Sequence, residues 1–329
     1  MKKKAGIIGF GRMGQIRLEV IKKLDIFEVV SIYDPYSTKK NRLFVNSLDD
    51  LFDNKNIEII FVCTPNYLNK KLTIESLKKE KHVFCEKPPG LNAKDIEEVI
   101  IAENKYKKTL MYGFNHRHHD SIQKIKQIVD KKEFGRILWM RGRYGKSVET
   151  DFYKNWRSKK EYSGGGILID QGIHMLDIFL YLAGDFDKIQ AAVSNLYWDL
   201  DIEDNVFAML QNSKNKIAAS LHSTMTQWRN LFSLEVFFEK GYVVLNGLNT
   251  SSKSYGEEVL NIAKNRSLAP AAIWEEEENI HFKIDNSWEK EIIEFNKSII
   301  KNTKPIIGNS LEALQLMKVI DKIYKFRER

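Results

Sequence analysis

The first 113 residues alternate short apolar segments with amphipathic helical patterns, and this alternation restricts the chain to few folds. The apolar segments are rich in β-branched and aromatic residues and show little polar alternation, so we predict buried strands. They span residues 5–10, 29–33, 57–63, 82–85 and 109–112. Helical patterns separate them at residues 13–24, just after Ser47, 68–79 and 93–105. Such an alternation predicts a parallel sheet covered on both faces, the doubly wound α/β architecture of Rossmann domains.

The pattern changes after about residue 119. Helical patterns at 121–130 and 167–182 flank a strand at 137–144. Further strand-like runs, separated by Asp-, Asn- and Gly-containing turns, cover residues 188–196, 206–211, 216–222, 231–238 and 242–245. Helices follow at 287–300 and 310–326, and the acidic run 275–278 is expected to be a solvated surface stretch. We therefore predict an α/β domain over residues 1–118 and an α+β domain with a largely antiparallel open sheet over residues 119–329.

Composition excludes several classes of protein. The 329 residues are 43% hydrophobic, which is enough for a sizeable core, and contain only two cysteines, too few for a disulfide scaffold or a four-cysteine zinc site. The 52 basic and 44 acidic residues are spread along the chain, which suits an anionic small ligand and gives little support for nucleic acid binding. No run approaches the ~20 apolar residues of a membrane span. Glycines at 6, 9 and 11 favour a first strand over a signal peptide, so we expect a cytoplasmic protein.

Gly9, Gly11 and Gly14 match the pattern G-x-G-x-x-G between the first predicted strand and the first predicted helix. In dinucleotide-binding folds the first glycine permits a tight turn, the second lets the backbone approach a pyrophosphate, and the third allows close helix–strand packing. The helix N-terminus adds N–H donors for phosphate. We therefore expect residues 1–118 to bind a dinucleotide, with contacts from the remaining motif residues Phe10, Arg12 and Met13.

Asp34 ends the second predicted strand, 20 residues after Gly14, where a carboxylate accepts hydrogen bonds from ribose hydroxyls. The alternative is a sharp turn followed by an exposed aspartate. A carboxylate repels the 2′-phosphate of NADP, so Asp34 favours NAD. Lys39, Lys40 and Arg42 are near enough to leave NADP open, unless they form an exposed basic helix face.

Other segments follow predicted strands and are expected at the same edge of the sheet, because ligands bind outside the carboxyl ends of parallel strands. They are Thr64-Pro65-Asn66, Glu86-Lys87-Pro88-Pro89 and Gly113-Phe114-Asn115. We expect these loops around the nicotinamide. Lys87 either polarises a carbonyl or exchanges a proton there, or is a surface lysine paired with Glu86.

In this order, these motifs resemble the Gfo/Idh/MocA oxidoreductases, relatives of glucose–fructose oxidoreductase and inositol dehydrogenase. The resemblance runs from residue 5 to about residue 325 and includes Gly164-Gly165-Gly166-x-x-x-Asp170-x-x-x-His174 and Glu133-Phe134-Gly135-Arg136-Ile137. It implies NAD, or NADP, as cofactor, a sugar-like substrate, and a C-terminal sheet that often forms dimers or tetramers. Implied cofactor contacts are Thr64, Pro65, Asn66, Glu86, Lys87 and Asn115.

Asp170 and His174 lie four residues apart on the predicted helix, so both face one side. The matching histidine in the family is commonly the proton donor or acceptor to the substrate hydroxyl. The resemblance implies that His174 takes this proton, Asp170 orients the imidazole or contacts substrate, and Lys87 stabilises oxyanion character. Without the resemblance, a buried and hydrogen-bonded helix histidine is the better interpretation.

The segment 151–157 is aromatic and basic, which suits stacking on a sugar and binding of an acidic group. The resemblance places it near the substrate pocket, and the alternative is an ordered surface loop. The implied substrate contacts are Tyr153, Trp156, Arg157, Lys87, Asn115, Asp170 and His174. The glycines 164–166 are expected to bring the start of the helix close to ligand.

His116, His118 and His119 cluster in sequence, but adjacent histidines splay apart and no carboxylate pair accompanies them, so we predict no metal site. Cys63 and Cys85 are expected to be buried free thiols. Two features bear on the family pattern. Many members have a histidine where this chain has Asn69, and a cis bond often precedes the proline at position 88.

We expect an NAD(P)-dependent enzyme that oxidises a secondary hydroxyl of a sugar, nucleotide-sugar or cyclitol, or reduces the matching ketone. The basic loop makes an acidic substrate reasonable. One alternative is an enzyme that retains and recycles its cofactor, such as an NAD-retaining glycosidase or an aldose–ketose oxidoreductase. Another is a cofactor-sensing regulator, against which the retention of Lys87, Asp170 and His174 argues. The substrate, reaction direction and cofactor preference stay open, and an exposed second sheet favours a homodimer or homotetramer.

Overall fold

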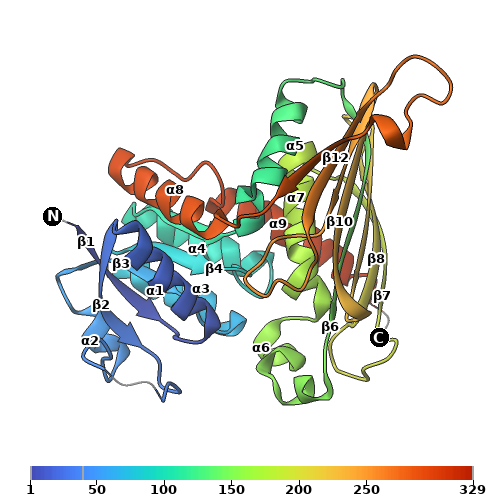
Figure 1. Ribbon diagram of the computed structural model, residues 1–329. Coiled ribbons are helices and arrows are strands. Elements are labelled where there is room, and N and C mark those ends of the chain that lie inside the picture. The colour runs from blue at the N-terminus through green and yellow to red at the C-terminus, as the bar shows by residue number, and fades with distance from the viewer. Residues whose placement is uncertain (1, 39–40, 328–329) are drawn as a thin grey trace. The chain divides into compact units, whose positions relative to one another are not determined.

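The computed structural model describes residues 2–38 and 41–327, which form two compact units (Figure 1). Unit 1 comprises Met1–Asn115, Glu161–Gly164 and Ser287–Lys318. Unit 2 comprises His116–Lys160, Gly165–Asn286 and Val319–Arg329. The division near residue 115 lies three residues before the predicted boundary, and the chain returns to unit 1 late in the sequence. A single boundary therefore does not describe this organisation.

Unit 1 is a parallel sheet with strand order β2-β1-β3-β4-β5 in the described ranges. Its strands are β1 (Lys3–Ile8), β2 (Phe27–Tyr33), β3 (Ile57–Val62), β4 (His82–Glu86) and β5 (Leu110–Gly113). Its helices are α1 (Arg12–Leu24), α2 (Leu48–Phe52), α3 (Asn66–Lys78), α4 (Ala93–Tyr106), α8 (Ser287–Lys301) and the first part of α9 (Ser310–Tyr324). Strand order reverses between β1 and β3, and this reversal creates the crevice in which doubly wound sheets bind ligands.

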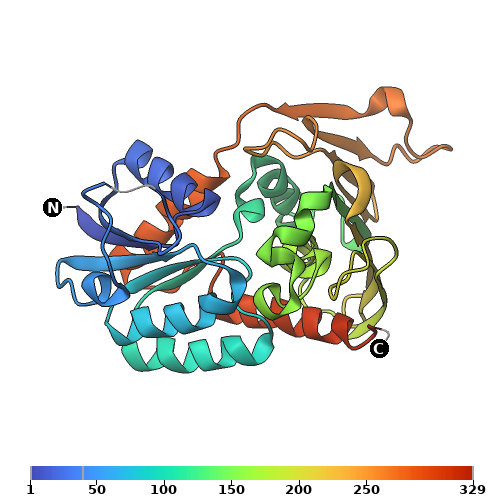
Figure 2. The same cartoon turned by 90° about the horizontal axis from the view of Figure 1, so that it is seen from below.

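Helices cover both faces of this sheet, as predicted from the strand–helix alternation. Helix α1 lies beside α8, and α3 lies beside α4 on the opposite face (Figure 2). Helix α8 belongs to this unit because its apolar face, with Phe295 at its centre, packs on Phe27, Phe61 and Phe84 at ring distances of 5.6–6.3 Å. The predicted doubly wound fold is confirmed.

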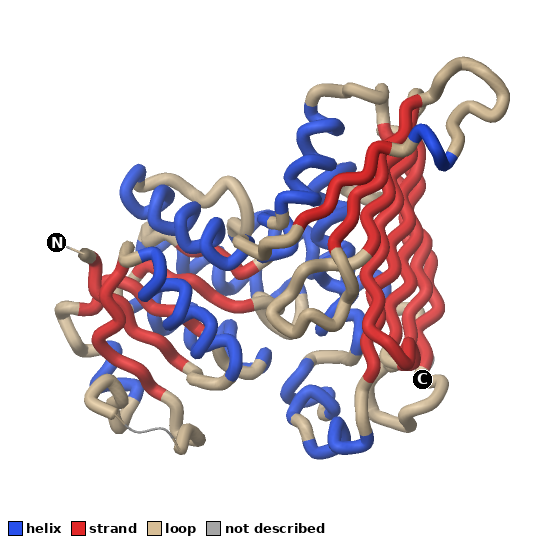
Figure 3. The backbone as a smooth tube through the Cα atoms, in the orientation of Figure 1, coloured by secondary structure: helices blue, strands red, loops and turns tan. Residues whose placement is uncertain are grey.

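Unit 2 contains a mixed, largely antiparallel sheet of order β13-β12-β11-β10-β6-β9-β8-β7 in the described residues, in which β6 and β9 are parallel. The strands are β6 (Ile137–Ser147), β7 (Lys188–Ser194), β8 (Asn205–Asn212), β9 (Ile217–Thr224), β10 (Thr226–Phe238), β11 (Gly241–Asn246), β12 (Glu258–Lys264) and β13 (Glu278–Phe282). Helices α5 (Asp120–Asp130) and α7 (Ile173–Ala183) lie on one side of the sheet (Figure 3). In β8, Ala208 and Leu210 are buried while Phe207 and Met209 are more than half exposed, so the opposite face is open.

Several elements differ from their predicted form. The predicted helix 167–182 is a π-helical turn (Leu168–Gly172) followed by α7. Strands β12 and β13 were not predicted, because their sequences mix charged and apolar residues. The run 275–278 is largely exposed, although Glu277 is half-buried and accepts a hydrogen bond from the Tyr242 hydroxyl at 2.7 Å.

The stretch Lys160–Ala183, which includes the short helix α6 (Lys160–Ser163), is long and apolar enough to cross a membrane by length and composition alone. The most apolar 18 residues of this stretch have a mean hydropathy of 1.3. The expectation that no run comes near the apolar length of a membrane span is therefore wrong. However, 83% of these 18 residues are buried inside the protein, as is typical of a core helix.

Candidate active site

In the glycine turn after β1, two glycines leave no space for a side chain and the third faces open space. Gly9 has φ +87°, and a Cβ there would lie 2.5 Å from the Cys63 carbonyl oxygen. A Cβ on Gly14 would overlap the Gly9 carbonyl oxygen, whereas a Cβ on Gly11 would meet no atom within 4 Å. The turn therefore packs tightly against the end of β3 and leaves open space at Gly11, where α1 begins.

Helix α1 begins without a capping side chain, since Gly11 is its N-cap. The first N–H groups of a helix have no intrahelical acceptor, and they favour an anion together with the helix dipole. In α1 these groups belong to Arg12, Met13 and Gly14. No acidic side chain lies in this first turn, so the residues present fit the diphosphate of a dinucleotide.

Asp34 holds the glycine turn to the end of β2. Its Oδ2 accepts the Phe10 N–H at 2.6 Å, and its Oδ1 accepts the Tyr36 N–H at 2.9 Å. Each carboxylate oxygen has a second lone pair, so Asp34 retains acceptor capacity for ribose hydroxyls. Because the Phe10 N–H donates to Asp34 and the Phe10 ring is buried, Phe10 supports the turn rather than offering a donor to phosphate. Arg42 is exposed, and Lys39 and Lys40 lie outside the described residues.

Asn69 fastens the loop after β3 to the loop after β4. Its fully buried amide donates to the carbonyl oxygens of Pro88 at 2.8 Å and Glu86 at 3.3 Å, which flank Lys87 in sequence. Its Oδ1 accepts a hydrogen bond from the Thr64 hydroxyl at 3.0 Å. Lys87 itself is half-buried, and the bond between Lys87 and Pro88 is cis. Asn69, which stands where many family members have a histidine, therefore links the loop after β3 to the loop after β4.

The remaining residues of the loop after β3, and Asn115, are also placed by hydrogen bonds or caps within unit 1. Pro65 is the N-cap of α3, and Asn66, the first residue of that helix, donates to the Ser163 carbonyl at 2.8 Å. Asn115 is buried and donates to the Ser287 hydroxyl at 3.2 Å. The side chains of Thr64, Asn66 and Asn115 therefore each donate a hydrogen bond within unit 1.

Glu86 is buried in the interior of unit 1. Its carboxylate accepts from Arg17 Nε at 2.6 Å, and Arg17 also contacts Glu291 at 2.8 Å. Burial opposes the charged form of Arg17, but Glu291 and Glu86 outweigh it and raise the pKa of Arg17 further above its ordinary value. The Arg17 guanidinium lies over the Phe84 ring at 4.3 Å. The Glu86 side chain therefore serves the core and is a poor candidate for a direct cofactor contact.

In unit 2, the π-helical turn carries Asp170, and His174 follows in the first turn of α7. A π turn closes hydrogen bonds from i to i+5, so residues four apart lie nearly above one another. The Asp170 carboxylate forms an ion pair with the Lys146 ammonium through Oδ2, and the Arg157 Nε lies 3.8 Å from Oδ1. Lys146 is the penultimate residue of β6 and is not among the predicted site residues. It lies two residues beyond the predicted strand 137–144, so the sequence pattern does not mark it as a site residue.

His174 is buried and belongs to an aromatic and imidazole cluster. Its ring stacks on His116 with centroids 3.7 Å apart and an interplanar angle of 18°. The His116 Nε2 is 2.9 Å from the Tyr144 hydroxyl. Burial, with Tyr255 and Asp170 nearby, raises the pKa of Tyr144 well above its ordinary value, so this phenol stays protonated. The cluster can hold or pass a proton next to His174, and Tyr144 and His116 were not predicted in this role.

The segment 150–157 forms short 3-10 turns that place its aromatic residues in different ways. The Tyr153 hydroxyl donates to the Trp198 carbonyl at 2.6 Å. Trp156 stacks under the Arg157 guanidinium at 4.4 Å. Phe152 is buried and lies 5.3 Å from the Lys146 ammonium. The segment is thus ordered around the two cations that contact Asp170.

The glycines before Asp170 pack against protein. A Cβ on Gly165 would overlap the Tyr324 hydroxyl, and a Cβ on Gly166 would overlap the Glu203 carbonyl oxygen. The buried Glu203 carboxylate accepts hydrogen bonds from the Leu168 N–H at 3.0 Å and the Tyr324 hydroxyl at 2.9 Å. Gly165 and Gly166 let the π turn pack against Glu203 and Tyr324, and the expectation that residues 164–166 lie close to ligand stays a prediction.

The histidines at 116, 118 and 119 and the two cysteines are possible metal ligands or a possible disulfide in the sequence. His119 Nδ1 lies 3.1 Å from the Glu258 carboxylate, and the described residues contain no group of three or more His, Cys, Asp or Glu that could hold a metal. Cys63 and Cys85 are free thiols. Burial raises the pKa of Cys85 to about 12.

Sequence comparison identifies the family of both parts of the chain. Residues 3–114 match "Oxidoreductase family, NAD-binding Rossmann fold", and residues 122–244 match "GFO/IDH/MocA C-terminal domain". The chain is 30% identical over 190 residues to myo-inositol 2-dehydrogenase of Thermotoga maritima, an alignment that covers 55% of this chain and 54% of that protein. It is 26% identical over 258 residues to 2,7-anhydro-N-acetylneuraminate hydratase of Escherichia coli, with 75% and 66% covered. The chain thus aligns with about half to two thirds of these relatives.

Among solved structures, a levoglucosan dehydrogenase in complex with NADH shares the fold, with a TM-score of 0.87, 20% identity and coverage of 99% of this chain and 97% of that chain. The two family matches together cover most of the sequence and agree with the parallel sheet of unit 1 and the mixed sheet of unit 2. The chain belongs to the Gfo/Idh/MocA family of oxidoreductases, and its N-terminal part is an NAD-binding Rossmann domain.

Proposed function

We propose that the protein is an NAD(P)-dependent dehydrogenase that oxidises a secondary hydroxyl of a sugar, nucleotide-sugar or cyclitol, or reduces the matching ketone. The observation that carries this proposal is the Asp170–His174 pair, with Asp170 held by Lys146 and His174 buried against His116. The relatives named myo-inositol 2-dehydrogenase and levoglucosan dehydrogenase support it.

The cofactor would be held by the N–H groups of Arg12, Met13 and Gly14 at the start of α1, with Asp34 on the ribose. Thr64, Pro65 and Asn66 border the same strand-end edge, as does Lys87. When bound, NAD supplies the group that accepts or returns a hydride. The carboxylate of Asp34 makes NAD the preferred cofactor, and NADP is the alternative.

His174 takes the hydroxyl proton of the substrate when the alcohol is oxidised and returns it in the reverse direction. Asp170, which the Lys146 ammonium holds in the π turn four residues before His174, orients the imidazole or contacts the substrate. The neutral Tyr144 hydroxyl, which contacts His116, provides an onward hydrogen bond. Lys87 stabilises negative charge on the substrate oxygen, and Asn115, Tyr153, Trp156 and Arg157 contact the rest of the substrate.

The proposal is tested by adding NAD⁺ or NADP⁺ and a panel of sugars, cyclitols and nucleotide-sugars to the protein and following absorbance at 340 nm. A steady increase with at least one compound supports a dehydrogenase. Saturable cofactor binding without turnover or product for any compound supports the regulatory alternative and contradicts the proposal.

A recycling enzyme is the second candidate, because one relative is named a hydratase, and a hydratase causes no net oxidation or reduction. In that case product forms while absorbance at 340 nm returns to its starting value. Product analysis by mass spectrometry of the same reactions therefore separates a recycling enzyme from a dehydrogenase.

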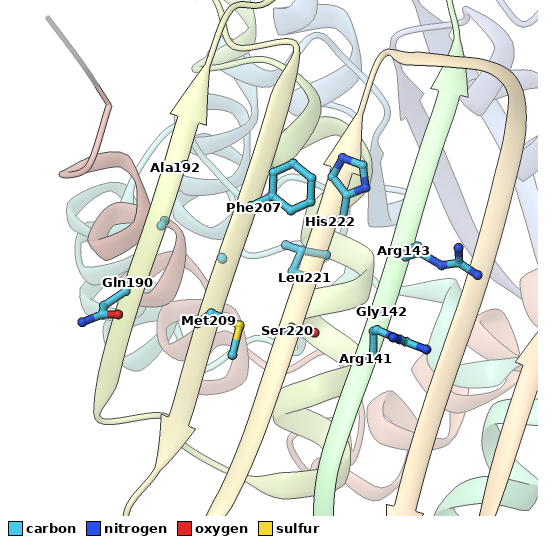
Figure 4. A pocket seen from close by; sticks show the side chains of 12 residues that line it. Arg141, Gly142, Arg143, Gln190, Ala192, Phe207, Met209, Ser220, Leu221 and His222 are labelled. Carbon is cyan, nitrogen blue, oxygen red and sulfur yellow. The ribbon is translucent and has the colours of Figure 1, made fainter.

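We also infer that the open face of the unit 2 sheet joins copies of the chain into a homodimer or homotetramer. This face carries a shallow hollow of about 410 Å³ across β7, β8, β9 and β6 (Figure 4). Phe207 stacks on His222 at 3.9 Å there, and Met209 lies on the same strand as Phe207. Phe207 and Met209 are both more than half exposed, and large apolar side chains exposed together on a sheet face are typical of a contact surface.

A further inference from the structure

The Asp170 carboxylate lies beside two cationic side chains, Lys146 and Arg157. In the described residues, it contacts the Lys146 ammonium through one oxygen and lies 3.8 Å from the Arg157 guanidinium through the other. One negative charge between two positive charges leaves a net charge of +1. Lys146 is itself well covered, with 13% of its side chain exposed, whereas 41% of the Arg157 side chain is exposed. The uncompensated charge therefore lies on the side of Arg157 that faces solvent.

The neighbouring side chains do not supply the missing negative charge. His174 and His116 carry no negative charge in either protonation state, and the buried Tyr144 keeps its proton because its pKa is raised. The segment 146–160 contains the basic residues Lys146, Lys154, Arg157, Lys159 and Lys160 but only the acidic residues Glu149 and Asp151. Both acidic residues are exposed, and neither forms an ion pair with Arg157 or Lys146 in the described structure.

Aromatic rings hold both cations in place. The Lys146 ammonium lies 5.3 Å from the centroid of Phe152, and the Arg157 guanidinium lies 4.4 Å from that of Trp156. Stacking leaves the edge of a guanidinium available, and that edge carries the donor fork that binds carboxylate and phosphate. At 3.8 Å the Arg157 Nε is beyond hydrogen-bond distance of Asp170, so this contact is a charge contact and does not use the fork.

We propose that Arg157, supported by Lys146, forms a subsite for a negatively charged group of the substrate, a carboxylate or a phosphate. Arg157 donates to the anion, and Lys146 holds Asp170 beside His174 so that the carboxylate does not compete for the Arg157 fork. The substrate class is therefore an acidic or phosphorylated sugar rather than a neutral one. The choice of a sugar rests on the proposed function, whereas the charge preference rests on this cluster.

The test measures binding separately from turnover. Calorimetric titration of the NAD⁺-saturated protein compares D-glucose with D-glucuronate, which adds a carboxylate, and with glucose 1-phosphate, which adds a phosphate. We expect at least one anionic sugar to bind about tenfold or more tightly than glucose, since a charge-assisted hydrogen bond is worth at least that factor. The anion that gains most identifies the carboxylate or the phosphate as the group that is recognised.

Variants connect the preference to the cluster. Arg157→Gln should reduce the ratio of the two affinities to within about twofold, and Lys146→Met should reduce it by a smaller factor, with Lys146→Arg restoring it. Lys154→Gln removes an exposed charge of the same loop and should leave the ratio unchanged. A charge preference that is absent in the wild type, or that survives Arg157→Gln, overturns the subsite. If binding shows the preference but no sugar is oxidised or reduced, the proposed function fails and the subsite stands.

Discussion

Asp34 illustrates how a single side chain holds the fold and, in the proposed complex, the cofactor. Its two oxygens accept the N–H groups of Phe10 and Tyr36, so the carboxylate shapes the glycine turn before any ribose reaches it. Glu86 differs, because its carboxylate is buried and forms an ion pair with Arg17. The position of a residue in a motif therefore identifies it as a candidate for ligand binding. Its hydrogen-bond partners in the protein show how much of its side chain remains available to a ligand.

Asp34→Asn should shift cofactor preference towards NADP. The amide keeps an oxygen for one of the two backbone donors but removes the charge that repels a 2′-phosphate. We expect the ratio of the Kd values for NADP⁺ and NAD⁺ to fall about tenfold or more, measured by fluorescence titration. Glu19→Gln, an exposed neutralisation on α1, is the control for net charge. An unchanged ratio would show that Asp34 does not face the ribose.

Among helices and strands, the sequence predicts those features that depend on residues adjacent in the chain. The apolar run at residues 59–62 of β3 and the glycines at the start of α1 are recognisable because their roles depend on neighbours in sequence. The location of α8 in unit 1 was not predictable, since periodicity shows which face of a helix is apolar but not which core it joins. Lys146 was missed for a related reason, because a lysine near the end of a strand carries no local sign of its partner Asp170.

The glycine turn allows a matched pair of substitutions. Gly11→Ala should leave thermal stability nearly unchanged, because a Cβ there meets no atom within 4 Å, but should weaken cofactor binding about tenfold or more. Gly14→Ala should destabilise the protein by several kcal/mol, because its Cβ would overlap the Gly9 carbonyl oxygen. Thermal unfolding and cofactor titration of both variants distinguish the two effects. Equal loss of stability in both variants would contradict the open position of Gly11.

For the whole molecule, the half-buried His82 is expected to make stability depend on pH. Burial and the nearby Lys108 and Lys3 lower the pKa of His82 to about 4 from 6.5, and its Nδ1 accepts the Thr109 N–H at 3.1 Å. The unfolded chain therefore binds more protons between pH 6.5 and 4, so the stabilisation by neutral His82 is present above pH 6.5 and declines as pH falls towards 4. Because the imidazole is partly exposed, we expect a loss of about 1 kcal/mol between pH 6.5 and 5.

His82→Asn keeps an acceptor for Thr109 and cannot titrate, so it should flatten this part of the pH profile. Urea unfolding at pH 6.5 and 5 for the wild type and the variant measures the difference, with other titrating groups common to both. Identical pH slopes would exclude the His82 contribution.

Assembly of the molecule is expected to depend on the open sheet. Met209→Glu places a charge on the exposed face of β8 and should convert an oligomer to a monomer, measured as molar mass by light scattering. Tyr36→Glu, at a residue that is 90% exposed in unit 1, should leave the mass unchanged. A wild-type protein that is monomeric, or a variant that still assembles, would contradict an interface on this face.

The proposed function requires that His174 exchanges the substrate proton in an NAD-linked oxidation. Rapid mixing of the NAD⁺-loaded protein with a compound that it converts, followed at 340 nm through a single turnover, tests this claim even for a recycling enzyme. We predict a rise in absorbance whose rate falls by about 10²–10⁴ in His174→Ala, with the cofactor Kd unchanged. An equal rate in the variant, or conversion without any rise at 340 nm, would contradict the claim.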